Sequence, residues 1–158
     1  MKPHWMDYRQ ATDNDVQDLK NIARRVINTN YAPFLGGEAV TAFIESGMSD
    51  KEIDDGLNDC TLMIRDKRTI GFAVTKEDLL HLMMIDVPFQ NAGYGTALLA
   101  HIEEMLFAKY HCIRLQTFKD NVPTVHFYLK EEWMPIREEE MPELGKTMLR
   151  FEKKRIAD

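Results

Sequence analysis

The segment from Met83 to Leu99 constrains the fold of this chain more than any other. Its sequence, MMIDVPFQNAGYGTALL, indicates a buried strand, a short turn with Gly93 and Gly95, and the first turn of a helix. Such a turn leaves backbone N–H groups unpaired beside the positive end of the helix dipole, which favours phosphate binding. Glycine has no Cβ, so a ligand can approach the backbone closely. The segment therefore predicts a site for a phosphate-bearing cofactor.

Two common phosphate-binding motifs are excluded by the residues around these glycines. A dinucleotide fold has Gly-x-Gly-x-x-Gly in its first strand–helix unit. Here Leu98 stands three residues after Gly95, and three predicted strands precede the strand that leads into the turn. A Walker loop has Gly-Lys followed by Ser or Thr, and this turn lacks that triplet.

The composition bounds the class of protein. With 158 residues, the chain is predicted to form a single domain over residues 1–158. Its net charge of −6 argues against nucleic acid as a partner. No apolar run is long enough to span a bilayer, the N-terminus lacks the apolar core of a signal peptide, and no metal site is indicated. Cys60 and Cys112 are expected to be reduced thiols, so we expect a cytoplasmic protein with no membrane partner.

Hydrophobic periodicity predicts an α/β (α+β mixed) chain. The acidic segment 49–59 is interpreted as a short helix or a loop, and Thr12 or Asp13 is expected to cap the first helix. The element order is β-α-α-β-β-β-α-β-α-β-β. Predicted strands cover residues 5–10, 60–65, 69–75, 79–87, 112–118, 133–138 and 147–152. Predicted helices cover residues 16–27, 38–46, 93–109 and 124–130. In the helix over residues 93–109, we expect Leu98, Ile102, Met105 and Leu106 to form a buried stripe.

Two motifs resemble those of one known family. Gln90-x-x-Gly93-x-Gly95 resembles the acyl-CoA-binding signature of the GNAT superfamily of N-acetyltransferases. Downstream, Asn121, Tyr128 and the aromatic Trp133 resemble the family's Asn-x-x-Ala-x-x-x-Tyr-x-x-x-Gly-Phe segment. The element order also matches the family over residues 5–152. The resemblance implies a GNAT-like fold, with a central mixed, mostly antiparallel sheet flanked by helices, and acetyl transfer from acetyl-CoA.

The sequence departs from the family pattern at three positions. Pro88 stands two residues before Gln90 rather than three, Glu132 replaces a glycine, and Thr124 replaces an alanine. These departures leave room for a second hypothesis, a CoA-binding or degenerate module of the same fold that acts through a protein partner.

The resemblance also implies how acetyl-CoA is bound. Backbone N–H groups of the turn would hold the pyrophosphate, the strand edge at Ile85 and Val87 would pair with the pantetheine arm, and Asn121 would fix that arm. A backbone N–H on the same strand would polarise the thioester carbonyl. The implied cofactor-binding residues are Ile85, Val87, Gln90, Asn91, Ala92, Gly93, Tyr94, Gly95, Thr96 and Asn121.

The expected reaction is direct attack of an amine on the thioester in a ternary complex, with no acyl-enzyme. Tyr128 resembles the residue that protonates the departing thiolate, although a core tyrosine on a short helix remains an alternative. His81 is the first candidate for the base, and a packed or surface histidine is the alternative reading. Weaker candidates for the base are Glu38, Glu77, Asp78, Asp86 and His126.

The acceptor is expected to bind at segment 28–38, between the first two helices. Tyr31 and Phe34 would contact the acceptor and Glu38 would attract its ammonium group, although both aromatic residues would equally serve to pack the helix connection. A small-molecule amine is the leading acceptor, with a protein or peptide N-terminus as the alternative. Exposed edge strands are also compatible with a homodimer.

Overall fold

The computed structural model describes residues 6–156, which pack into two compact units. The first unit contains residues 6–75 and 82–100, and the second contains residues 76–81 and 101–156. Strand β4 (Leu79–Ile85) and helix α5 (Tyr94–Phe107) each contribute residues to both units. Trp5, where the first strand was expected to begin, lies outside the described residues.

The strands of the first unit form consecutive antiparallel pairs. Strand β1 (Met6–Gln10) pairs with β2 (Cys60–Arg65), which pairs with β3 (Arg68–Lys76). The strands predicted at residues 60–65 and 69–75 thus form a hairpin, and its turn is only Asp66-Lys67, because Arg68 already pairs with Arg65. Both turn residues have positive φ, 50° and 64°, which matches the right-handed twist of a tight hairpin.

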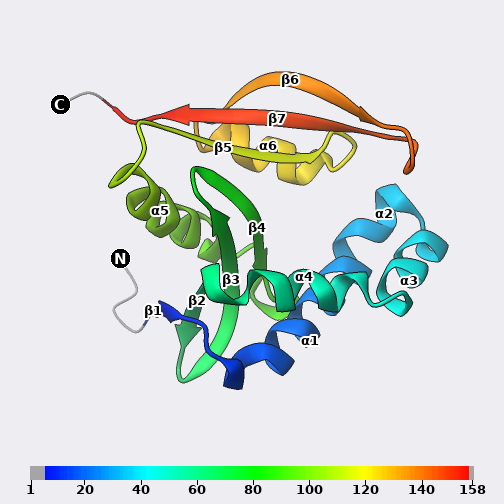
Figure 1. Ribbon diagram of the computed structural model, residues 1–158, viewed down its shortest axis with the longest axis horizontal. Coiled ribbons are helices and arrows are strands. Elements are labelled where there is room, and N and C mark those ends of the chain that lie inside the picture. Colours follow the sequence, from blue (N-terminus) through cyan, green and yellow to red (C-terminus); the bar gives the residue numbers. More distant parts are fainter. Residues whose placement is uncertain (1–5, 157–158) are drawn as a thin grey trace. The chain divides into compact units, whose positions relative to one another are not determined.

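The helices of the first unit follow one another almost without a break (Figure 1). After a 3₁₀ turn capped by Thr12, α1 covers Val16–Val26 and continues through a π-helical turn, Ile27–Tyr31, into α2 (Ala32–Leu35). Helices α3 (Gly37–Glu45) and α4 (Met48–Gly56) complete the set. The acidic segment is thus a helix, and residues 28–35, which were expected to lie between the first two helices, are helical as well.

The core of the first unit lies between α1 and one face of its strands. In α1, Leu19, Ile22, Ala23 and Val26 recur at helical spacing and are buried, whereas Val16 is partly buried. From the strands, Leu62, Phe72 and Met84 belong to the same buried cluster. The full cluster is Ala11, Leu19, Ile22, Ala23, Val26, Ile27, Val40, Ile53, Cys60, Leu62, Phe72, Val74 and Met84.

The second unit is built on a long antiparallel ribbon (Figure 1). Strand β7 (Lys146–Lys154) lies between β5 (Cys112–Phe118) and β6 (Met134–Met141), and pairs with both. The first residues of β4 pair with β5 in parallel. Helix α6 (Val122–Lys130) connects β5 to β6 and begins two residues earlier than predicted, with Pro123 in its first turn.

Strand β4 is hydrogen-bonded into both sets of strands, which gives the order β1-β2-β3-β4-β5-β7-β6. Among the described residues, the β4–β5 pair is parallel, and the pairs β1–β2, β2–β3, β5–β7 and β6–β7 are antiparallel. The predicted mixed, mostly antiparallel sheet with flanking helices is therefore confirmed. Helices α2 and α4 add to the predicted element order.

The differences from the predictions include the bounds of β4 and α5 and one buried position. Strand β4 ends at Ile85 rather than Val87, and α5 begins at Tyr94 and ends at Phe107. Within α5, Leu98, Ile102 and Leu106 are buried as expected. Met105 is 40% exposed, so the prediction that it belongs to the buried stripe was wrong. No helix within residues 6–156 has the length and apolar character needed to cross a membrane.

Candidate functional site

The predicted cofactor turn connects β4 to α5 within the first unit. Asp86 caps a short 3₁₀ turn, Val87–Phe89, by accepting a hydrogen bond from the Val87 N–H at 2.9 Å. The chain then reverses through two positive-φ residues, Asn91 at 60° and Gly93 at 89°, before α5 begins. No atom lies within 4 Å of a Cβ built on Gly93, so the turn is open there.

The turn presents backbone donors to solvent. Among the described residues, the N–H groups of Asn91, Ala92 and Gly93 donate to no backbone carbonyl, and all three residues are exposed. They directly precede the first turn of α5, where the helix dipole is positive. This is the arrangement that binds an anionic group through main-chain N–H groups.

Gln90 has its polar groups committed to the protein. Its side-chain Nε2 donates to the Ile85 carbonyl at 2.8 Å and to Asn30 Oδ1 at 3.1 Å. Its Oε1 accepts a hydrogen bond from Asn30 Nδ2 at 3.0 Å, and its backbone N–H donates to the Val87 carbonyl. The Gln90 side chain therefore braces the turn, whereas the sequence predicts it only as a cofactor contact.

Asp86, at the end of β4, anchors the same turn to helix α1. Its carboxylate is 1% exposed and forms a two-point ion pair with Arg25 of α1, at 3.0 and 2.9 Å. The hydrogen bond from Arg25 to Asp86 raises the pKa of the guanidinium. Arg68 lies 3.7 Å from the same carboxylate and stacks over the Phe89 ring at 5.0 Å. Both oxygens of the Asp86 carboxylate accept hydrogen bonds within the protein, so the structure shows this side chain as an anchor of the turn.

The predicted pantetheine edge is shorter than expected. Ile85 is the last residue of β4, whereas Val87 lies in the 3₁₀ turn, and its N–H donates to Asp86. Gly71 allows the neighbouring strand to approach, since a Cβ there would lie 2.9 Å from the Met84 carbonyl oxygen. The backbone of β4 near Ile85 therefore lies close to the backbone of β3 at Gly71.

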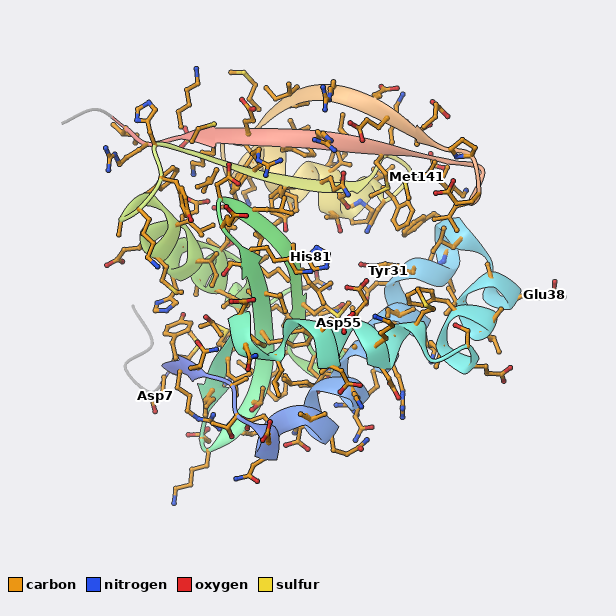
Figure 2. All side chains as sticks on the ribbon, viewed as in Figure 1. Asp7, Tyr31, Glu38, Asp55, His81 and Met141 are labelled. Atoms are coloured by element: carbon orange, nitrogen blue, oxygen red, sulfur yellow. The ribbon has the colours of Figure 1, made fainter. Side chains whose placement is uncertain are left out.

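The predicted acceptor residues lie on separate helices of the first unit. Tyr31 ends the π-helical turn and packs on Phe34 of α2, with ring centroids 5.5 Å apart. Glu38 lies in the exposed first turn of α3 (Figure 2). Burial, followed by the negative charge of Glu52, raises the pKa of the Tyr31 phenol. Glu52, on α4, thus contributes negative charge near Tyr31, and the sequence analysis did not single it out.

The second unit contains the downstream motif. Asn121 is buried at the start of α6, and its backbone bonds to Phe118 and Val125. Tyr128 lies seven residues later, within α6. Its ring is buried against Phe127, Trp133 and Phe151, with centroids 5.1, 5.9 and 5.9 Å away. These ring contacts are the ones expected if Tyr128 is a core tyrosine on a short helix.

His81 is exposed on β4 in the second unit (Figure 2). Of the weaker candidates for the base in that unit, Asp78 forms a two-point ion pair with Arg114, at 2.9 and 3.0 Å. The hydrogen bond from Arg114 lowers the pKa of Asp78, which makes it a weaker base. His126 is exposed on α6, and Glu77 is a turn residue with φ of 55°.

Side chains of the types that bind metal ions do not cluster within the described residues. Residues 6–156 contain no group of three or more His, Cys, Asp or Glu side chains that could hold a metal ion. Cys60 and Cys112 are free thiols, and burial raises the pKa of Cys60 to about 12. Cys60 is therefore protonated at neutral pH and unreactive as a nucleophile.

Comparison with known proteins connects both motifs to one family. The sequence model of the acetyltransferase (GNAT) family matches residues 25–131, which include the β4–α5 turn, Asn121 and Tyr128. No curated protein matches the chain.

Solved structures match nearly the whole chain. A GCN5-related N-acetyltransferase from Rhodopseudomonas palustris is 13% identical, with a TM-score of 0.83 over 98% of this chain and 99% of that one. The PaiA N-acetyltransferase of Thermoplasma acidophilum, in complex with coenzyme A, is 18% identical, with a TM-score of 0.79 over 95% and 99%. The ribosomal-protein-S18-alanine N-acetyltransferase of Escherichia coli is 13% identical, with a TM-score of 0.72 over 97% and 96%.

Proposed function

Because this chain belongs to the acetyltransferase (GNAT) family, we propose that it transfers the acetyl group of acetyl-CoA to a primary amine of a small molecule. The observation that carries the proposal is the β4–α5 turn. Its exposed N–H groups at Asn91, Ala92 and Gly93 lie inside the matched region and directly before a 14-residue helix. A family match alone supports acetyl transfer, and the turn supplies the cofactor site that the transfer needs.

The turn's role is to bind and orient the cofactor. Its N–H groups and the positive end of the α5 dipole are suited to the pyrophosphate of CoA. Gly93 leaves room for the phosphate oxygens, because nothing lies within 4 Å of its absent side chain. Asp86 and Gln90 hold these donors in place before the cofactor arrives, which reduces the entropy lost on binding.

The chemistry requires two proton movements. The amine nitrogen attacks the thioester carbonyl, the C–N bond forms, and the C–S bond breaks. The ammonium must lose a proton before or during attack, and the thiolate must gain one. We assign the first role to His81, directly or through water, and the second to the Tyr128 hydroxyl. Exposure of His81 allows it to pass its proton on to solvent.

The acceptor is proposed to contact the aromatic pair Tyr31 and Phe34. A cationic amine is attracted both by aromatic faces and by a carboxylate. Glu52 acts electrostatically on Tyr31 and therefore supplies negative charge at this pair, while Glu38 lies in the exposed first turn of α3. This combination favours a small amine that is protonated in solution.

The proposal is tested by following thiol release from acetyl-CoA in the presence of a broad panel of amines. The panel includes alkylamines, arylalkylamines, polyamines, amino acids and peptides with free N-termini. We expect at least one small amine to stimulate release above the rate with acetyl-CoA alone. Preferential turnover of the peptides would instead assign a protein or peptide acceptor.

A thermal-shift measurement with CoA separates an enzyme from a binding module. A ligand at 100 times its dissociation constant stabilises a protein by about 2.7 kcal/mol. A clear shift without turnover of any amine would indicate a CoA-binding module and contradict the proposed transfer. The absence of any shift would remove the cofactor assignment itself.

A further inference from the structure

A reciprocal amide pair connects the π-helical turn to the cofactor turn within the first unit. Asn30 and Gln90 are 60 residues apart in sequence, and each donates one hydrogen bond to the other, at 3.0 and 3.1 Å. Because the Gln90 NH₂ group also donates to the Ile85 carbonyl, its orientation is fixed: an amide flipped the other way would set two acceptors against each other.

Asn30 reaches Gln90 from an unusual backbone. Residues Ile27–Tyr31 form a π-helical turn inserted between α1 and α2. Such turns are rare in proteins as a whole, but those that occur are often found at functional sites. The turn changes the direction in which its side chains leave the helix. The neighbouring residue, Tyr31, belongs to the proposed acceptor pair, so one short segment carries both contacts.

Gln90 is the last residue before the exposed donors of the turn. Its side chain holds the end of β4, at Ile85, and the start of the reversal at Asn91 in one geometry. Without Asn30, Gln90 would keep its bond to Ile85 but lose the two bonds that fix its amide plane. The N–H groups that follow would then lose part of their preorganisation, whereas Arg25 would still hold Asp86 and keep the turn folded.

We propose that Asn30 is a positioning residue for acetyl-CoA: through its amide pair with Gln90, it holds the N–H groups of the turn in the geometry that binds the cofactor. Asn30 touches neither cofactor nor acceptor in this role. The proposal rests on the cofactor assignment made above.

Calorimetric titration with CoA tests the proposal on the full chain. Loss of two neutral hydrogen bonds predicts that Asn30→Ala weakens CoA affinity by about five- to tenfold. Gln90→Ala should weaken it at least as much. Because Asn30 acts only through Gln90, the double variant should bind no more weakly than Gln90→Ala alone.

Asn21→Ala is the matched control. Asn21 lies on α1 and accepts a hydrogen bond from Gln17, at 3.2 Å, so this variant breaks the same kind of amide pair at an exposed site of the first unit. We expect its CoA affinity to equal that of the parent protein. In steady-state assays, Asn30→Ala should raise KM for acetyl-CoA by the same factor as the dissociation constant and leave kcat within about twofold.

The outcomes separate this proposal from the proposed function. If the parent protein binds no CoA, the cofactor assignment fails, and this inference fails with it. If the parent binds CoA and Asn30→Ala binds it equally well, only the positioning role is overturned. A lower melting temperature with unchanged affinity would likewise assign Asn30 to stability alone.

Discussion

Arg25 of α1 and Asp86 at the end of β4 form a two-point ion pair, with nitrogen–oxygen distances of 3.0 and 2.9 Å. The aspartate side chain is 1% exposed, whereas the arginine side chain is 48% exposed. The same carboxylate caps the turn that follows the strand. One ion pair thus connects the first helix of the chain to the base of the proposed cofactor site.

Replacing Arg25 with Met should destabilise the protein by about 2 kcal/mol, measured by urea unfolding. The variant leaves the buried Asp86 carboxylate with only the Val87 N–H and the more distant Arg68, and removing one partner of a buried pair is costly. Lys51→Met is the control, because the Lys51–Asp55 pair has side chains 65% and 55% exposed and should contribute nothing measurable. Equal losses in the two variants would contradict the anchoring role of Asp86.

Gly93→Ala should weaken CoA binding beyond its effect on stability. Gly93 has φ of 89°, so alanine is strained there by about 1 kcal/mol, and its methyl group would occupy the open space of the turn. Gly145→Ala carries comparable backbone strain, since Gly145 has φ of 61° in the β6–β7 turn and open space around it. Calorimetry should find reduced CoA affinity only for Gly93→Ala. Similar affinities in both variants would place the cofactor elsewhere.

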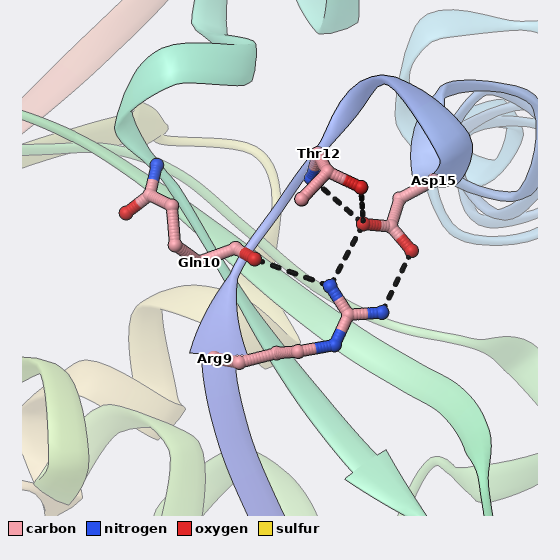
Figure 3. Close-up of polar contacts among 4 residues, drawn as sticks. All are labelled: Arg9, Gln10, Thr12 and Asp15. Carbon is pink, nitrogen blue, oxygen red and sulfur yellow. Dashed lines mark hydrogen bonds and ion pairs between the residues drawn. The ribbon is translucent and has the colours of Figure 1, made fainter.

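Stability should fall at acidic pH through Asp15 (Figure 3). Hydrogen bonds from Arg9, at 2.9 Å each, lower the pKa of this carboxyl to about 2, and the Thr12 N–H adds to the effect. Because the folded pKa lies below the unfolded value of about 4, the stabilisation is present above pH 4 and is lost as pH falls toward 2. Because the Arg9 side chain is half-exposed, solvent screens its interaction with Asp15, and the stabilisation amounts to about 1–2 kcal/mol.

Asp15→Asn tests this linkage by urea unfolding across pH 2 to 7. The variant should be less stable than the parent at pH 7, and the difference between the two should shrink as pH approaches 2. A difference that stays constant over this range would mean that Asp15 acts through its shape and neutral hydrogen bonds rather than its charge.

Tyr128→Phe should slow turnover at least about tenfold, because the variant removes the hydroxyl proposed to protonate the thiolate. The phenylalanine ring preserves the contacts with Trp133 and Phe151, so CoA affinity and melting temperature should change little. Tyr110→Phe makes the same chemical change in the α5–β5 connection and should leave kcat unaltered. An unchanged kcat in Tyr128→Phe would return Tyr128 to the purely structural reading.

Local patterns predicted the sheet and the turn well. Strand β5 lies where alternation and turn residues placed it, and the β2–β3 hairpin was one turn residue shorter than expected. These elements are specified by neighbouring residues, whose periodicity is visible in the sequence. The signature Gln90-x-x-Gly93-x-Gly95 is also contiguous, so the candidate turn could be found before its geometry was known.

The contacts that brace the site could not be predicted in this way. Arg25–Asp86 and Asn30–Gln90 join residues 61 and 60 positions apart, and no periodicity relates such positions. The end of β4 was placed two residues too late because Val87 is apolar, while the Asp86 side chain captures its N–H and starts a 3₁₀ turn. Covariation between relatives would be the signal for the two long-range pairs.

The most direct test of acetyl transfer uses acetyl-CoA that carries an isotopic label in its acetyl group, together with the most active amine from the panel. Mass spectrometry then follows the label. We predict that the label is recovered on the amine nitrogen in amounts equal to the free CoA produced, and that Tyr128→Phe slows its appearance. Label that stays in acetyl-CoA, or appears only as free acetate while the protein is folded, would contradict the assignment as an N-acetyltransferase.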